Sequence, residues 1–235
     1  IMAGTNIYIY GAVAATGGLS TPTALLAANG DFILEGSVAV TGSGFGNVDL
    51  TIQADGLVDQ AGAIVIGTPM GGAGTLEIIG PYLQQDFTLT TIHAAGLLSL
   101  DSSGTDYAVI GGTIDLAGDI ITDTILAIEG GTLNVLGYGA AINGELSVLQ
   151  GGVINIGTTS SGAWLIHTDG TVTVGALAPN LTPSEGTVNL FTSSKFLLPA
   201  AASTSAFVVL TGGVLNMYGA EIALAVSRVA ALELD

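Results

Sequence analysis

The chain has no cysteine and very few basic residues, and each absence excludes a class of protein. Without cysteine there is no disulfide framework, no thiolate metal site and no cysteine nucleophile. Lys195 and Arg228 are the only basic residues beside nineteen aspartates and glutamates, which gives a formal net charge of −17. Nucleic acids and anionic membranes attract clustered lysine and arginine, so we expect neither as a partner.

Charged residues of either sign are scarce as well. They make up 9% of the 235 residues, against about 25% in an ordinary soluble domain, while 49% are hydrophobic and 36 are glycine. A surface so poor in charge is typical of a protein that is covered by further copies of itself or coated with small and hydroxylated residues. Both interpretations favour a protein that assembles.

Long uninterrupted apolar runs are also missing. The first thirty residues carry no charge, but glycines and Pro22 interrupt them, so they do not predict a membrane span. No basic segment of a signal peptide precedes them. The chain opens with Ile1, as a mature exported product would, and its two basic residues leave few sites for trypsin-like proteases. We therefore expect an extracellular or cell-surface location.

One short phrase recurs along the chain: glycine, a small or β-branched residue, an apolar residue, a polar residue and an apolar residue. It reads GTLEI, GTIDL, GTLNV, GVINI, GTVTV, GTVNL and GVLNM, and begins at Gly74, Gly112, Gly131, Gly152, Gly170, Gly186 and Gly213. Most occurrences lie about twenty residues apart, a period typical of solenoids. Alternation turns the apolar positions of a strand toward a core and the polar position outward. The outward residues are Glu77, Asp115, Asn134, Asn155, Thr173, Asn189 and Asn216. We expect the four asparagines, Asn134, Asn155, Asn189 and Asn216, to stack as a polar ladder.

A second apolar segment precedes many of these phrases, with a glycine corner between the two. The segments are YAVI, ILAI, LSVL, WLIH and FVVL, starting at Tyr107, Ile125, Leu146, Trp164 and Phe207. Glycine suits a sharp corner because it adopts positive φ and permits close backbone approach. The pattern predicts an all-β, parallel β-solenoid of about nine or ten coils. Asn-Gly and Asp-Gly pairs, for example at Asn143 and Asp169, favour an antiparallel alternative with hairpins, but they do not recur periodically.

The predicted solenoid spans residues 31–219, with residues 1–30 and 220–235 as terminal caps or interaction segments. Ser20 or Thr21 as N-cap, Pro22 in the first turn and Asn29-Gly30 as a stop signal predict a short N-terminal capping helix.

The phrases GGTLNV, GGVINI and GGVLNM resemble the autotransporter-associated β-strand repeats and related β-helical adhesin passengers. The resemblance covers the chain from about Gly74 to Met217. It implies a secreted, right-handed β-helix that serves surface display or adhesion.

The segments that precede the phrases are apolar at both alternating positions, which predicts an apolar stripe on the outer surface. We expect the stripe to pack against further copies through Ile125, Ala127, Leu146, Val148, Phe207 and Val209. The resulting hypothesis is a structural subunit of an extracellular filament, sheath or surface layer. The alternative is a β-helical adhesin or glycan-binding rod whose asparagine ladder contacts glycans, and the third is a polysaccharide-active enzyme.

Little in the sequence predicts catalysis. The two basic residues do not supply the cations that a lyase of acidic sugars needs, and paired carboxylates such as Glu77 and Asp115 are typical of solvated strand positions. We expect no enzyme activity and no cofactor. The candidate metal site is a calcium site at Asp101 and Asp106, where carboxylates flank a glycine-containing turn.

Overall fold

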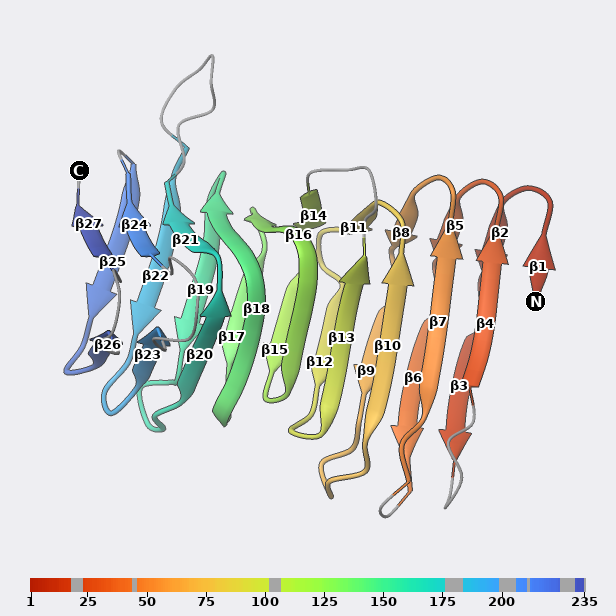
Figure 1. Cartoon of the computed structure of the whole chain (residues 1–235), viewed down its shortest axis with the longest axis horizontal. Coiled ribbons are helices and arrows are strands. Elements are labelled where there is room, and N and C mark those ends of the chain that lie inside the picture. The colour runs from red at the N-terminus through yellow and green to blue at the C-terminus, as the bar shows by residue number, and fades with distance from the viewer. Residues whose placement is uncertain are drawn as a thin grey trace.

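The computed structural model describes residues 1–17, 23–43, 46–101, 107–175, 184–198, 206–210, 212–224 and 231–234. These residues form an elongated rod whose strands lie across the long axis (Figure 1). No helix occurs among them, and so none that could cross a membrane.

The strands form three faces that run along the rod. Face 1 contains β1 (Met2–Ala3), β4 (Thr23–Ala28), β7 (Asp49–Ala54), β10 (Gly74–Ile79), β13 (Gly96–Asp101), the first part of β16 (Asp119–Glu129), the first part of β18 (Tyr138–Leu149), β20 (Trp164–Asp169), β23 (Lys195–Leu198) and β26 (Glu221–Leu224). Face 2 contains β2 (Ile7–Ile9), β5 (Phe32–Leu34), β8 (Val58–Gln60), β11 (Tyr82–Gln84), β14 (Tyr107–Ile110), the second parts of β16 and β18, β21 (Thr171–Val174), β24 (Ala206–Val209) and β27 (Ala231–Leu234). Face 3 contains β3 (Ala12–Gly17), β6 (Ser37–Gly42), β9 (Ala63–Ile66), β12 (Leu89–Ile92), β15 (Thr113–Leu116), β17 (Thr132–Val135), β19 (Gly152–Ile156), β22 (Gly186–Leu190) and β25 (Gly213–Met217).

Each strand pairs in parallel with the equivalent strands one coil before and after it. In face 3, for example, β19 pairs with β17 on one side and β22 on the other. Faces 1 and 2 are joined through β16 and β18, which continue around the corner between them. The predicted all-β parallel β-solenoid is therefore confirmed, with nine strands in face 3 among the described residues.

The core runs the length of the rod and is built by alternation. In β17 and β19 the side chains of Leu133, Val135, Ile154 and Ile156 are fully buried and point inward, one above another. Burying a side chain of this kind contributes about 1.5–3 kcal/mol, so the stacked rows stabilise the rod without disulfides. At the corner before β19, a Cβ on Gly152 would collide with the backbone oxygen of Ile128, which explains the glycine of the repeated phrase.

The prediction of a short N-terminal capping helix is wrong for the part of that segment that the structure describes. Residues 23–28 form strand β4, paired with β7 along its whole length, whereas Ser20, Thr21 and Pro22 lie outside the described residues. The alanines and leucines of this segment have good helix propensity, but pairing in register with a neighbouring strand outweighs that weak local preference.

The solenoid strands also extend beyond the predicted boundaries at residues 31 and 219. At the N-terminal side, β1, β2 and β3 pair with β4, β5 and β6. At the C-terminal side, β26 and β27 pair with β23 and β24. A capping role for the terminal segments stays a prediction.

Candidate functional site

A row of hydrogen-bonded amides lies on the outer side of face 3. Asn134 Nδ2 donates to Asp115 Oδ1 (2.9 Å), and Asn155 Nδ2 donates to Asn134 Oδ1 (3.0 Å). Asn189 Nδ2 then donates to Asn155 Oδ1 (2.9 Å), and Asn216 Nδ2 donates to Asn189 Oδ1 (2.8 Å). We call these five residues the amide ladder. All five are half-buried, and each faces the next in strand register.

The ladder has a direction that its residue types explain. Every amide donates toward the N-terminal end of the rod, so the first member has only to accept. A carboxylate is an acceptor without N–H donors, and Asp115 occupies that first position. Each inner member uses one N–H and one oxygen lone pair within the ladder. One N–H and one lone pair per amide are left for other partners.

Threonine hydroxyls flank part of the ladder, in a row that Val153 interrupts and that ends with Val214. Thr113, Thr132 and Thr187 lie two residues before ladder members, on the same outward side of their strands. All three are half-buried. The C-terminal half of face 3 therefore presents amides and hydroxyls side by side.

Two of the outward residues that the repeated phrase predicts do not belong to this row. Glu77 lies in β10 on face 1, where it accepts a hydrogen bond from Thr51 Oγ1 (2.9 Å). Thr173 lies in β21 on face 2, in register with Ser147 and Val208. The phrase thus marks strands of all three faces. The polar ladder of Asn134, Asn155, Asn189 and Asn216 does form, because their four phrases all fall on face 3.

The predicted apolar interface is wrong for most of its residues, because they line the core. Leu146, Val148 and Phe207 are fully buried, and Val209 is 6% exposed. FVVL is apolar at every position and does not indicate which set points inward, whereas in LSVL the polar Ser147 alternates with Leu146 and Val148 and indicates that these two point inward. Ala127 points the other way but is also fully buried, and Ile125 is half-buried. The outer stripe that motivated a self-assembling polymer is therefore absent at these positions.

The candidate calcium pair cannot be assembled from the described residues. Asp101 ends β13, and its backbone oxygen accepts a hydrogen bond from Gly80 N (2.7 Å). Asp106 lies outside the described residues. Within the described ranges no group of three or more histidine, aspartate or glutamate side chains is close enough to hold a metal ion. The calcium site stays a prediction.

The sequence reasoning missed two aromatic pairs, one at the start of face 1 and one directly after the ladder strands β22 and β25. Trp164 meets Tyr138 edge to face, with ring centroids 5.5 Å apart, and the Phe191 and Tyr218 rings stack at 5.5 Å. A signal for the second pair was present, since Phe191 and Tyr218 each follow a ladder asparagine by two residues. Continuing the alternation by one step past the phrase would have placed both rings on the outer side.

Polar side chains also occur inside the solenoid, nearer its N-terminal end. Tyr82 donates its hydroxyl hydrogen to Gln60 Oε1, and Gln60 Nε2 donates to Thr90 Oγ1 (3.0 Å). All three residues are almost completely buried, and burial raises the pKa of the Tyr82 hydroxyl well above its ordinary value. These groups satisfy one another within the core, and we infer a structural role for them.

The comparisons with known proteins assign no family to the chain. No protein-family model matches it, and no curated protein matches it. A crystal structure of a TibC-catalysed, hyper-glycosylated TibA fragment aligns with 97% of this chain and 100% of that fragment, at 13% sequence identity and a TM-score of 0.22. A similarity at that TM-score carries no argument. The class of the protein rests on its own geometry: a parallel β-solenoid with an amide ladder on one face.

Proposed function

We propose that the chain is an extracellular, surface-displayed adhesin rod that binds glycans along the amide ladder. The ladder is the observation that carries the proposal. It holds a line of amide groups on a rigid sheet, and each inner member retains one free donor and one free acceptor position.

The ligand class follows from the chemistry of this surface. Amides and threonine hydroxyls donate and accept hydrogen bonds, and sugar hydroxyl groups do the same. A net charge of −17 repels phosphate polymers, so a nucleic acid is a poor ligand for the same groups. An uncharged or weakly charged polyhydroxyl chain fits the surface best.

The order of the ladder favours affinity. Each amide is already held by its neighbours, so binding freezes few side-chain rotations, and such preorganisation reduces the entropic loss on binding. Neighbouring coils lie about 4.8 Å apart, so one glycan lying along the rod can contact several amides at once. Repeated weak contacts of this kind are typical of adhesion.

The test is a glycan array probed with the labelled protein and two variants. Asn155→Leu interrupts the ladder at its centre, and Thr173→Leu is the matched control on the outer side of face 2. We expect the wild type and the control to bind the same glycans and Asn155→Leu to bind them much more weakly. Circular dichroism checks that both variants keep their strands. An array without signal, or equal binding by all three proteins, would contradict the proposal.

The same preparations separate the other hypotheses. Long regular filaments in negative-stain electron microscopy would favour the polymer subunit instead. Release of reducing ends from a bound polysaccharide would favour an enzyme. Isolated rods that retain intact glycans are the result expected for an adhesin.

A further inference from the structure

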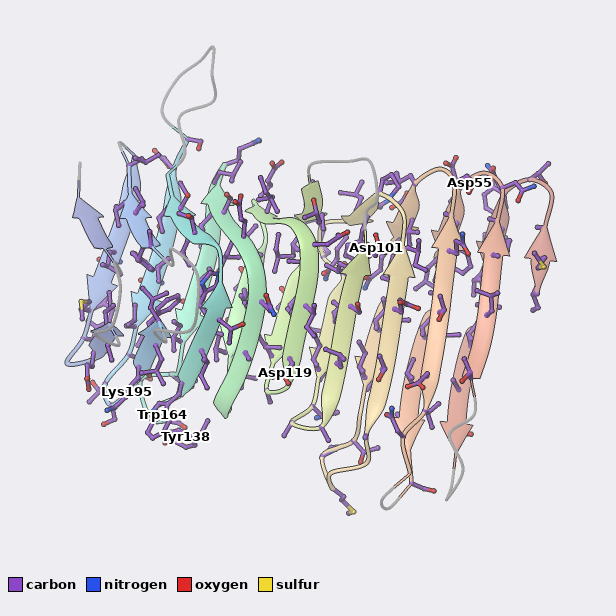
Figure 2. The ribbon with its side chains drawn as sticks, viewed as in Figure 1. Asp55, Asp101, Asp119, Tyr138, Trp164 and Lys195 are labelled. Atoms are coloured by element: carbon purple, nitrogen blue, oxygen red, sulfur yellow. The ribbon has the colours of Figure 1, made fainter. Side chains whose placement is uncertain are left out.

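A second row of side chains begins where the ladder face ends. Tyr138, Trp164, Lys195 and Glu221 are the first residues of β18, β20, β23 and β26, and they face one another in strand register along face 1. Figure 2 shows Tyr138, Trp164 and Lys195 next to one another at the edge of the rod. Lys195 Nζ lies 5.6 Å from the centroid of the Trp164 ring and 2.9 Å from Glu221 Oε2.

These residues border a hollow of about 400 Å³. Its other walls come from Ser193, Ser194, Gly219 and Ala220, in the corners that connect face 3 to face 1. The chain reaches this hollow directly from the ladder, since Gly219 lies three residues after Asn216. A corner of a few residues therefore separates the amide ladder on face 3 from the hollow at the start of face 1.

The walls of the hollow are fixed by backbone hydrogen bonds. Glu221 N donates to Ser194 O (3.1 Å), and Lys195 N donates to Ala163 O (2.9 Å). Ser193 adopts a φ of 63°, a conformation that is unfavourable for a residue other than glycine. Such conformations persist only where surrounding contacts hold them, and they occur preferentially at functional sites.

We propose that this hollow binds one ring of an uncharged sugar, with Trp164 and Tyr138 as its apolar wall. Ligand pockets commonly combine aromatic walls with a few polar groups that fix orientation. A sugar ring has an apolar face of C–H groups for the aromatic rings, and its hydroxyls suit the polar groups of the rim. The proposal rests on the proposed function and adds a defined subsite to it.

The charges of the site select an uncharged ring. Lys195 is the single lysine of the chain, and its ammonium is already paired with Glu221. The hollow therefore offers a donor and an acceptor without a net positive charge. A ligand carboxylate would have to displace Glu221 against the repulsion of a protein with a net charge of −17. Sugars with carboxylates bind less well for that reason.

The test uses the intrinsic fluorescence of the protein, because Trp164 is its single tryptophan. The probes are the methyl glycosides of glucose, galactose, mannose and N-acetylglucosamine, with methyl glucuronide as the acidic comparison. We expect a saturable change in emission with at least one neutral glycoside and a weaker one with the glucuronide. No saturable change with any neutral glycoside, or equal binding of the glucuronide, overturns the proposal.

Two variants connect the signal to the hollow. Tyr138 is 67% exposed, so Tyr138→Ala removes an aromatic wall without opening the core. We expect it to weaken binding about tenfold, the usual effect of losing one stacking partner. Tyr10→Ala removes an aromatic ring that is 70% exposed near the N-terminal end, and we expect no change from it. Equal affinity of Tyr138→Ala and wild type would overturn the assignment.

The glycan array and the Trp164 fluorescence together distinguish a failure of the sugar subsite from a failure of the ladder proposal. Glycan-array binding that depends on Asn155, without any response of Trp164 to the glycosides, leaves the ladder proposal intact and removes the sugar subsite. A Trp164 response that is unchanged in Asn155→Leu, with no ladder-dependent binding on the array, removes the ladder proposal and keeps the subsite.

Discussion

The two halves of face 3 have the same interior and different exteriors. On the inner side, Ile64 of β9 and Ile154 of β19 are equally buried in one continuous core. On the outer side, the ladder row begins with Ala14, Ala39 and Val65, which have no hydrogen-bonding side chains, and Thr91 follows them as the neighbour of Asp115. In the C-terminal half the same register position holds the amide ladder.

The difference shows which positions of a coil determine the fold and which are left for function. The inward positions must fill a core whose shape repeats from coil to coil, so they stay aliphatic in both halves. The outward position of a parallel strand only has to tolerate its neighbours, and it is alanine in β6 and asparagine in β19. A property confined to the outer row of one half is therefore not needed for the solenoid. That is why the ladder is the better candidate for a functional role.

The largest expected effect tests the shared interior. We expect Ile64→Ala and Ile154→Ala each to lower the free energy of unfolding by about 2–5 kcal/mol, because each removes a fully buried side chain and leaves a cavity. Urea denaturation followed by circular dichroism measures both. A loss below about 1 kcal/mol in only one half would show that the two interiors are not equivalent.

The same denaturation measurement can show whether Phe207, a residue of the predicted interface, lies in the core or on the surface. Phe207→Ala should destabilise the protein by about 3–5 kcal/mol if the ring is in the core. An exposed ring in an intermolecular stripe would give an effect of about 0.5 kcal/mol or less in the monomer.

The next effect concerns the polar groups inside the N-terminal half. Removing the hydroxyl in Tyr82→Phe takes one of two donors from Gln60 Oε1, the other being Thr90 Oγ1 at 3.3 Å. We expect a loss of about 1–3 kcal/mol at neutral pH from the poorly satisfied amide. The folded state also raises the pKa of this hydroxyl, so it binds the proton more tightly than the unfolded chain does. The Tyr82 hydroxyl therefore makes its full contribution to the free energy of unfolding below the ordinary tyrosine pKa of about 10. That contribution falls as the pH rises above this value.

Denaturation curves at several pH values check the sign of this effect. We expect the unfolding free energy of the wild type to decrease above about pH 10 and that of Tyr82→Phe to decrease less. Parallel curves for the two proteins would show that Tyr82 is not the group responsible.

The sequence predicted the part of this architecture that depends on alternation within one strand. The inward Leu133 and Ile154 and the outward Asn134 and Asn155 were placed correctly, because each phrase has one polar position between two apolar ones. In a segment such as FVVL at Phe207, both sets are compatible with either side, and only the corner before the strand determines which set turns inward. The error at Phe207 and Val209 comes from that ambiguity, whereas at Leu146 and Val148 the alternation with Ser147 already indicated burial.

The sequence pattern also did not predict that each coil contributes to three faces. The phrase at Gly74 begins a strand of face 1, and the phrase at Gly170 precedes a strand of face 2. A short motif specifies a strand with its corner, whereas the number of strands per turn depends on corners that differ in length. The hollow beside Trp164 could not be predicted for the same reason, since four successive coils contribute to its walls.

A smaller effect measures the ladder itself. Asn155→Leu removes two ladder hydrogen bonds, whereas Asn216→Leu at the end of the ladder removes one. Because the residue type changes identically, the difference between the two variants isolates one bond, which we expect to contribute about 0.5–1.5 kcal/mol. Urea denaturation measures it. Equal destabilisation by the two variants would mean that the amides act independently and do not support one another.

The smallest effect comes from building a ladder step in the half that has none. Ala39 and Val65 face each other in register on the outer side of β6 and β9. In Ala39→Asn with Val65→Asn, the new amide at position 65 can donate to the one at position 39, in the direction that the natural ladder follows. A double-mutant cycle should give a favourable coupling of about 0.5–1 kcal/mol, although each single substitution alone destabilises the strand slightly. Zero coupling would show that register alone does not form a ladder step, and that the C-terminal half adds a geometric requirement beyond the strand pairing that both halves share.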